Sequence, residues 1–233
     1  MNCRRCVYCF FVVGLSTGIM LSPAHAQPNV GEAVVIQNEV LRGAEAATTA
    51  MSVGDAVLRN DTVQTGAYSA ARFVMADSTN LSLGPNAKIR IDRSVFNDEH
   101  SYRDIAINMT SGAFRWVTGH SDKNAYKITT PLATIGIRGT ILDVLSQRGQ
   151  TTVVLQEGAA SVCTLGFQCT QLTQPGDTVI VTATGGGRVT TKKTNNPSWS
   201  FAQTCSAAAG LCTITDLAGA QPSQEFTGIL CGR

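Results

Sequence analysis

The chain has 233 residues with 18 basic and 16 acidic side chains, and 43% of its residues are hydrophobic. This length is sufficient to bury a core without depending on disulfides. The balanced charge excludes the concentrated positive patches that nucleic acids and anionic membrane surfaces require, so we expect no nucleic-acid partner.

The first 26 residues have the features of a cleavable signal peptide. Arg4 and Arg5 form a basic start, residues 7–21 are mostly apolar, and residues 24–26 (Ala-His-Ala) form an A-x-A cleavage site. A retained membrane anchor is the alternative, but the apolar run is short and is interrupted by Gly, Ser and Thr. We therefore expect an exported, periplasmic protein with no stable membrane insertion after cleavage.

Short apolar segments that alternate with polar residues then follow one another along most of the chain. This period of two, with frequent turns, predicts an all-β domain over residues 27–184, either a sandwich or a β-roll or solenoid-like module. The stretches 43–51 and 97–102 lack the alternation and are expected to be loops. The segments with strand character are 30–36, 55–65, 70–75, 80–83, 88–92, 104–109, 114–117, 153–155 and 179–181.

The composition changes near residue 185, where three glycines are followed by a polar stretch. Asn196 and Pro197 are a plausible N-cap and first helical residue, which predicts a short helix over 199–209. We interpret residues 185–233 as a small, disulfide-stapled C-terminal extension and not as a second domain.

Eight cysteines divide into three within the leader and five after it. An oxidising compartment permits disulfides, and the nearest pairs are Cys163 with Cys169 and Cys205 with Cys212. Other connectivities stay open, as does the state of Cys231. Zinc is the rival interpretation, but the five cysteines after the leader form no C-x-x-C and no His lies close to them.

Four segments resemble the FecR domain and occur in that family's order. They are VGDAVLRNDTVQTGAYSAARFVMADSTNLSLGPNAKIRID (53–92), SGAFRWVTG (111–119), YKITTPLATIGIRGT (126–140) and TTVVLQEGAASV (151–162). The most specific phrases are GDTVxTG, ADGSxLxLGPN and TPxAxIGVRGT, and Thr79-Asn80 replaces the usual Gly-Ser-type turn. The residues that match these phrases are Gly54, Asp55, Asp61, Gly66, Asp77, Gly84, Pro85, Asn86, Pro131, Gly136, Arg138, Gly139 and Thr140.

The resemblance implies a periplasmic all-β module that receives a signal from an outer-membrane receptor through protein contacts. In the best-understood members of the family, this module follows a cytoplasmic anti-sigma segment and one transmembrane helix. Only about 26 residues precede it here, so we expect a stand-alone exported FecR-type protein that does not regulate a sigma factor directly. Its partner would be an envelope protein.

Arg138 lies between two glycines at the corner of the third phrase. We expect its five donors to satisfy carbonyl groups or to pair with a carboxylate such as Asp143 or Asp55. An anion-binding role is the alternative. Asp55, Asp61 and Asp77 are expected to cap turns or to take part in buried pairs.

No constellation of residues predicts catalysis, a cofactor or a metal site. His100 and His120 lie in polar, loop-like surroundings, and the adjacency of His120, Ser121 and Asp122 does not make a triad, whose members meet in space. The acidic residues near His100 lack the spacing of a calcium-binding loop. We therefore predict a protein that is not an enzyme.

The leading hypothesis is a binding or signal-relay module, and the alternative is an envelope scaffold that binds glycan or peptidoglycan. The alternative requires aromatic side chains exposed in one groove. Phe73, Phe114, Trp116 and Tyr126 are instead expected in the core, since strand aromatics usually pack on cross-strand neighbours.

Overall fold

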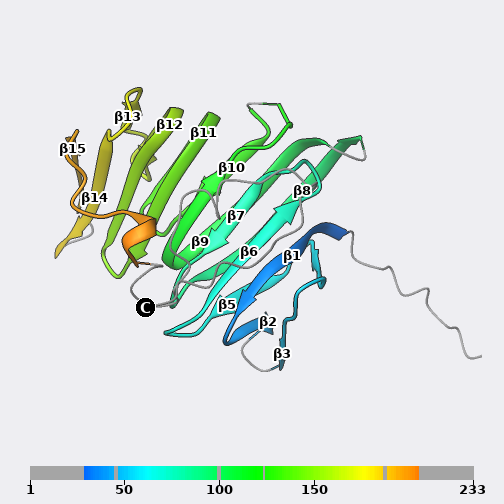
Figure 1. Ribbon diagram of the computed structural model, residues 1–233. Coiled ribbons are helices and arrows are strands. Elements are labelled where there is room, and N and C mark those ends of the chain that lie inside the picture. Colours follow the sequence, from blue (N-terminus) through cyan, green and yellow to red (C-terminus); the bar gives the residue numbers. More distant parts are fainter. Residues whose placement is uncertain (1–28, 45–46, 99–100, 123, 186–187, 205–233) are drawn as a thin grey trace, which may run out of the picture.

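The computed structural model describes residues 29–44, 47–98, 101–122, 124–185 and 188–204, and every structural statement below concerns these residues (Figure 1). They form one mixed sheet of 15 strands, and a helical turn at 201–204 follows the last strand. The strands are β1 (Asn29–Gln37), β2 (Val40–Ala44), β3 (Ala47–Ala50), β4 (Ala56–Leu58), β5 (Thr62–Thr65), β6 (Ala70–Met75), β7 (Asn80–Leu83), β8 (Lys88–Asp98), β9 (Ser101–Val117), β10 (Tyr126–Thr129), β11 (Ala133–Gln147), β12 (Gln150–Thr164), β13 (Cys169–Leu172), β14 (Thr178–Thr184) and β15 (Arg188–Thr194).

The long strands β9, β11 and β12 change partners midway and so belong to two layers. The first part of β9 pairs with β8 and β10, whereas its last residues pair with β7 and β11. The first layer contains β4, β1, β6, β7, β14 and β15, and the second contains β3, β2, β5, β8, β10 and β13. The all-β prediction is therefore confirmed, and the strands of the two layers belong to one continuous mixed sheet.

Glycines permit the long strands to bend where they pass between the layers. Gly112 in β9, Gly139 in β11 and Gly158 in β12 have φ of +96°, +58° and +82°, a region that disfavours other residues. A Cβ on Gly158 would lie 2.0 Å from the Gly139 carbonyl oxygen, so β11 and β12 approach too closely there for any side chain.

The bend in β11 also shifts which side chains face the core. Ile135 and Ile137 are buried before it, and Leu142 and Val144 are buried after it. The register with β12 slips between Arg138 and Leu142 at a β-bulge, which moves the alternation by one residue.

Inward side chains of both layers form one hydrophobic cluster. Phe73 and Trp116 come from the first layer, and Ile107 and Ile135 come from the second. Trp116 and Tyr126 are 0% and 4% exposed, as expected for core aromatics, and their rings meet edge to face at 5.1 Å between centroids.

Two stretches that were expected to be loops belong largely to strands. Residues 43–51 include the end of β2 and all of β3, and residues 97–102 include the end of β8 and the start of β9. Strand β3 is exposed at every residue and, among the described strands, pairs only with β2. It therefore has no buried face and no apolar alternation to reveal it.

The C-terminal part of the described chain first extends the sheet and then packs a helical turn on the outer face of the first layer. β15, which lies within the segment 185–233, pairs with β14 in the sheet. The predicted helix begins at residue 201, and its predicted end lies outside the described residues. Phe201 is buried beside Ala70 and Ala113, and a Cβ on Gly84 would lie 3.3 Å from its ring.

Candidate functional site

A groove of about 620 Å³ crosses the outer surface of the second layer, over β10, β11, β12 and β13. None of its lining residues is acidic, and most of its exposed side chains are polar. The lining residues are Asn124, Tyr126, Gly136, Ile137, Arg138, Ala159, Ala160, Ser161, Gln171 and Thr173.

The groove exists because small residues occupy neighbouring positions on adjacent strands. Gly136 lies opposite Lys127 on β10 and opposite Ser161 on β12, and Ser161 lies opposite Gln171 on β13. Gly136 contributes no side chain and Ser161 a small one, so the sheet surface is hollow between the longer Lys127 and Gln171.

Packing does not require glycine at position 136. Its φ is not in the left-handed region, and a Cβ added there would meet nothing within 4 Å. The open space over Gly136 is therefore accessible from outside the protein, and a residue at this point of the family's most specific phrase could be larger without disturbing the fold.

Arg138 is exposed near Gly136 in the groove lining. The predicted pairing of its side chain with Asp143 or Asp55 is wrong. Within the described residues its side chain has no hydrogen bond or ion pair, while its backbone N–H donates to Thr140 Oγ1 at 2.9 Å. The bulge in β11 separates the two residues: Arg138 faces outward from the second layer, and Asp143 faces outward from the first.

Asp143 pairs instead with Arg115, and both side chains are buried. Arg115 Nε and Nη2 donate to the two carboxylate oxygens at 2.6 and 2.7 Å. Gln156 Nε2 and the Phe201 N–H also donate to Asp143, each at 3.0 Å. The Arg115 guanidinium lies over the Phe201 ring at 5.6 Å, so this ion pair anchors the C-terminal segment.

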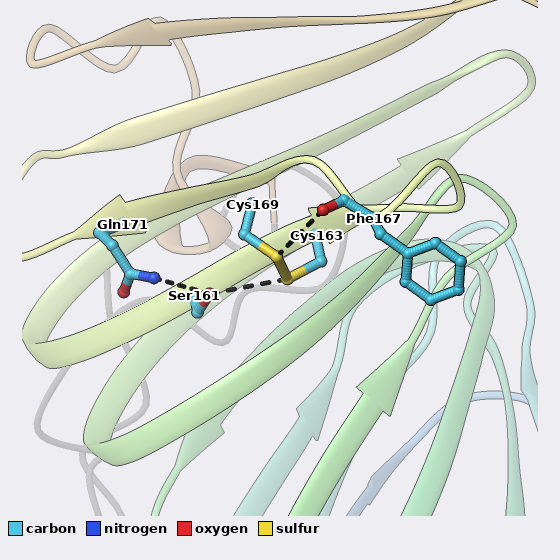
Figure 2. The surroundings of a disulfide bond; sticks show 5 residues. All are labelled: Ser161, Cys163, Phe167, Cys169 and Gln171. Atoms are coloured by element: carbon cyan, nitrogen blue, oxygen red, sulfur yellow. Dashed lines mark hydrogen bonds between the residues drawn. A yellow bond between two sulfur atoms is a disulfide. The ribbon is translucent and has the colours of Figure 1, made fainter.

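A disulfide holds the outermost strand of the groove. Cys163 on β12 and Cys169 on β13 are joined, with their Cα atoms 4.0 Å apart, as the spacing in the sequence predicted (Figure 2). Gln171 Nε2 donates to Ser161 Oγ at 3.0 Å between the same strands. The predicted Cys205–Cys212 pair lies outside the described residues.

The turn closed by this disulfide exposes two apolar side chains. Leu165 is 63% exposed and Phe167 is 91% exposed, and Figure 2 shows the Phe167 ring directed away from the sulfur atoms. Phe167 has φ of +60°, an uncommon conformation for a bulky residue.

Tyr126, at one end of the groove, is fixed from below by a buried polar network. Its hydroxyl donates to Asp77 Oδ2 and contacts Thr79 Oγ1 at 2.8 Å. Asp77 also accepts from the Thr79 N–H and hydroxyl at 3.1 and 3.0 Å. This network connects the second FecR-like phrase with the segment 126–140 that contains the third, far apart in the sequence.

The remaining motif residues lie at turns and bends and do not line the groove. Asp55 Oδ2 accepts from the Ser52 N–H, and Asp61 Oδ2 accepts from the Leu58 N–H, both at 2.8 Å. Thr140 Oγ1 donates to the Ala159 carbonyl at 2.8 Å beside the bend. The others with turn or bend positions are Gly54, Gly66, Gly84, Pro85, Asn86, Pro131 and Gly139.

Two carboxyl groups among the described residues have shifted pKa values. Burial raises the pKa of Asp61, and the Leu58 N–H and the Arg42 guanidinium at 3.2 Å oppose this rise. The hydrogen bond from the Thr173 N–H lowers the pKa of Asp177, and Lys193 at 2.9 Å lowers it further, whereas burial opposes both effects.

The histidines do not form a catalytic arrangement in the described part of the chain. His120 is exposed and its Nδ1 lies 3.2 Å from the Asp77 carbonyl oxygen, and His100 lies outside the described residues. No group of three or more His, Cys, Asp or Glu side chains among the described residues is close enough to bind a metal ion. Within the same ranges, no helix combines the length and hydrophobicity needed to cross a bilayer.

Sequence comparison identifies a known domain in the central part of this sheet. The FecR protein family profile matches residues 61–161, so the chain contains a FecR domain. A comparison with curated proteins gave no match.

Two crystal structures of a candidate anti-sigma factor from Parabacteroides distasonis are similar to this chain. At 1.65 and 2.50 Å resolution, they have TM-scores of 0.47 and 0.46 and sequence identities of 15% and 16%. Each alignment covers 56% of this chain and 58% of the other, so the similarity spans less than two thirds of those proteins.

Sequence reasoning missed Arg115, Asn124 and Gln171. A signal for Arg115 was present, because it stands between the apolar Phe114 and Trp116, and Asp143 stands between Leu142 and Val144. Single opposite charges inside two apolar strands indicate a pair on the same sheet face. No comparable signal marks Asn124 or Gln171, which look like ordinary surface amides.

Proposed function

We propose that this protein is a non-enzymatic, periplasmic module that relays a signal through protein–protein contacts. The FecR domain supports a signalling role. The leader-like residues 1–26 support export to the periplasm. The contact mechanism that the geometry favours is the addition of a partner's strand to an exposed sheet edge.

The exposed edge position of strand β3 is the main support for this mechanism. Among the described residues it has no strand on its outer side, so it forms an edge of the second layer, and all four of its residues, Ala47–Ala50, are exposed and uncharged. An edge of this kind presents unpaired backbone N–H and C=O groups to any extended segment that approaches it.

Basic side chains lie at the other edges of the described sheet. Arg42 Nη2 donates to the Ala56 carbonyl on β4, and Lys193 Nζ donates to the Gln171 carbonyl on β13 at 2.8 Å. Strand β15 itself carries three basic residues in the segment RVTTKKT. Since charges on edge strands discourage pairing with other chains, β3 is the edge most open to a partner within the described part of the sheet.

The glycan-binding alternative receives less support. Trp116 and Tyr126 are buried, and the large exposed aromatic side chains in the described part are Tyr68 and Phe167, which lie on separate turns. A sugar platform needs aromatic faces gathered in one groove, and the single aromatic residue that lines the groove over Gly136 is Tyr126, which is 4% exposed.

Site-specific photo-crosslinking in the envelope of the native host tests the proposal. A photo-reactive amino acid would replace Thr48 on β3, and a matched control would carry it at Thr190, an exposed position on the basic strand β15. We expect the Thr48 probe to capture an outer-membrane receptor or an inner-membrane regulator that the Thr190 probe does not capture.

Proline substitutions supply the second part of the test. Proline removes the N–H group that an added strand would use, so one of Thr48→Pro and Thr49→Pro should abolish capture while leaving the circular dichroism spectrum unchanged. Equal capture at both probe positions, or recovery of peptidoglycan alone, would overturn the relay function and favour the scaffold.

A further inference from the structure

We propose that the groove over Gly136 binds an extended acidic segment of a partner protein, with Arg138 receiving a side-chain carboxylate. This site is separate from the strand-addition surface, because the groove and β3 lie towards opposite ends of the second layer. Failure of one surface to bind leaves the other proposal standing.

The charge of the groove selects an anion. Arg138 is exposed in the lining and its side chain has no hydrogen bond or ion pair within the described residues, and Lys127 stands exposed on β10 directly opposite Gly136. None of the lining residues carries a negative charge. A carboxylate matches the planar fork of an arginine and forms two parallel, charge-assisted hydrogen bonds with it.

The shape of the groove selects an extended ligand over a small ion. Its volume of about 620 Å³ lies within the range of ligand sites, and it crosses four strands. Asn124 lies at one side and Gln171 at the other, with Gly136 between them, so the polar groups are dispersed along the hollow. Such amides can satisfy the backbone of a peptide that lies across the sheet.

The disulfide keeps the β13 side of this site in place. It joins β12 to β13 two residues before Gln171, and Gln171 in turn donates to Ser161 on the groove floor. Loss of the disulfide should therefore weaken binding while the charge of Arg138 is unchanged. Comparing this loss with that of an Arg138 variant separates the contribution of groove shape from that of charge.

A library of hexapeptides, acetylated and amidated so that only side chains carry charge, tests the proposal against the full-length protein. We expect the wild type to enrich peptides that contain Asp or Glu. The dissociation constant of an enriched peptide, measured by calorimetry, should rise about tenfold or more when its acidic residue becomes the matching amide, because a charge-assisted pair is lost.

Two substitutions in the protein should reproduce this loss. Arg138→Gln removes the charge, and Gly136→Val fills the hollow, where an added Cβ meets nothing and the fold should be retained. Lys192→Gln, which removes a charge from the exposed strand β15, is the matched control and should bind like the wild type.

Three results would overturn the proposal: no enrichment of acidic peptides, equal affinity of the Arg138→Gln variant, or displacement of the peptide by an equal concentration of inorganic phosphate. The last result would make the groove a site for a small anion. Thermal melting of each variant verifies that a loss of binding does not reflect unfolding.

Discussion

Two arginines in this protein should respond very differently to the same substitution. Arg115 is 1% exposed and holds Asp143, whereas Arg138 is exposed at the groove. We predict that Arg115→Met lowers the free energy of unfolding by about 3–5 kcal/mol. Arg138→Met, the matched control, should change it by no more than about 0.5 kcal/mol, as is usual for a surface position.

The magnitude follows from what Asp143 loses. The carboxylate is fully buried and accepts four hydrogen bonds, two of them from Arg115 at 2.6 and 2.7 Å. Methionine preserves most of the side-chain volume but leaves the negative charge with only the neutral donors of Gln156 and Phe201. An uncompensated buried charge is the costly outcome, and the intact pair is not itself strongly stabilising.

A double-mutant cycle separates this cost from lost packing. The Asp143→Leu variant should also lose about 3–5 kcal/mol, since it strands the Arg115 charge. The combined variant removes both charges, so its loss should be smaller than the sum of the two single losses by roughly 2 kcal/mol or more. Urea unfolding followed by circular dichroism provides all four free energies.

Two outcomes would refute this reasoning. A loss below about 1 kcal/mol for Arg115→Met would mean that the buried charge of Asp143 is tolerated without its partner. A loss above about 2 kcal/mol for Arg138→Met would restore Arg138 to the structural role that the sequence suggested.

Three further predictions concern the disulfide, the buried tyrosine and acid stability. Replacing Cys163 and Cys169 together by alanine should cost about 2 kcal/mol for so short a loop, measured by urea unfolding, and an unchanged midpoint would contradict this. Tyr126→Phe removes a donor from the buried Asp77 carboxylate and should cost about 1–3 kcal/mol, so an unchanged melting temperature would show that Asp77 is satisfied without it. The pKa of Asp177 is lowered by folding, so its carboxylate stabilises the protein above the unfolded pKa, and this stabilisation is lost as the pH falls through the folded pKa. Between about pH 5 and pH 3, the wild type should therefore lose more stability than Asp177→Asn, and parallel losses would contradict the assignment.

The sequence alone predicted the features that depend on short-range order. Alternation of apolar and polar residues is a property of a few neighbouring positions, so the strands and the all-β class were readable from it. The six-residue separation of Cys163 and Cys169 likewise indicated a closed turn, and the structure contains that disulfide. The FecR-like phrases carried the family resemblance because they are runs of adjacent residues.

The pairing of side chains across the sheet depended on long-range geometry. Arg115 and Asp143 are 28 residues apart, and only the register of β9 against β11 places them opposite each other. The bulge near Gly139 shifts the alternation of inward and outward side chains in β11 by one residue. Counting along a regular strand would place Arg138 and Asp143 on opposite faces, whereas both point outward, each from its own layer.

The groove and the free edge have the same origin. Gly136, Ser161 and Gln171 are ordinary residues in the sequence, and they create a hollow only because three strands align them in one row. Strand β3 has no buried face, so its residues carry no pattern, and its exposure is decided by which strands occupy the other positions in the sheet. Local alternation determines that a segment is a strand, but register, bulges and strand order determine what that strand presents to a partner.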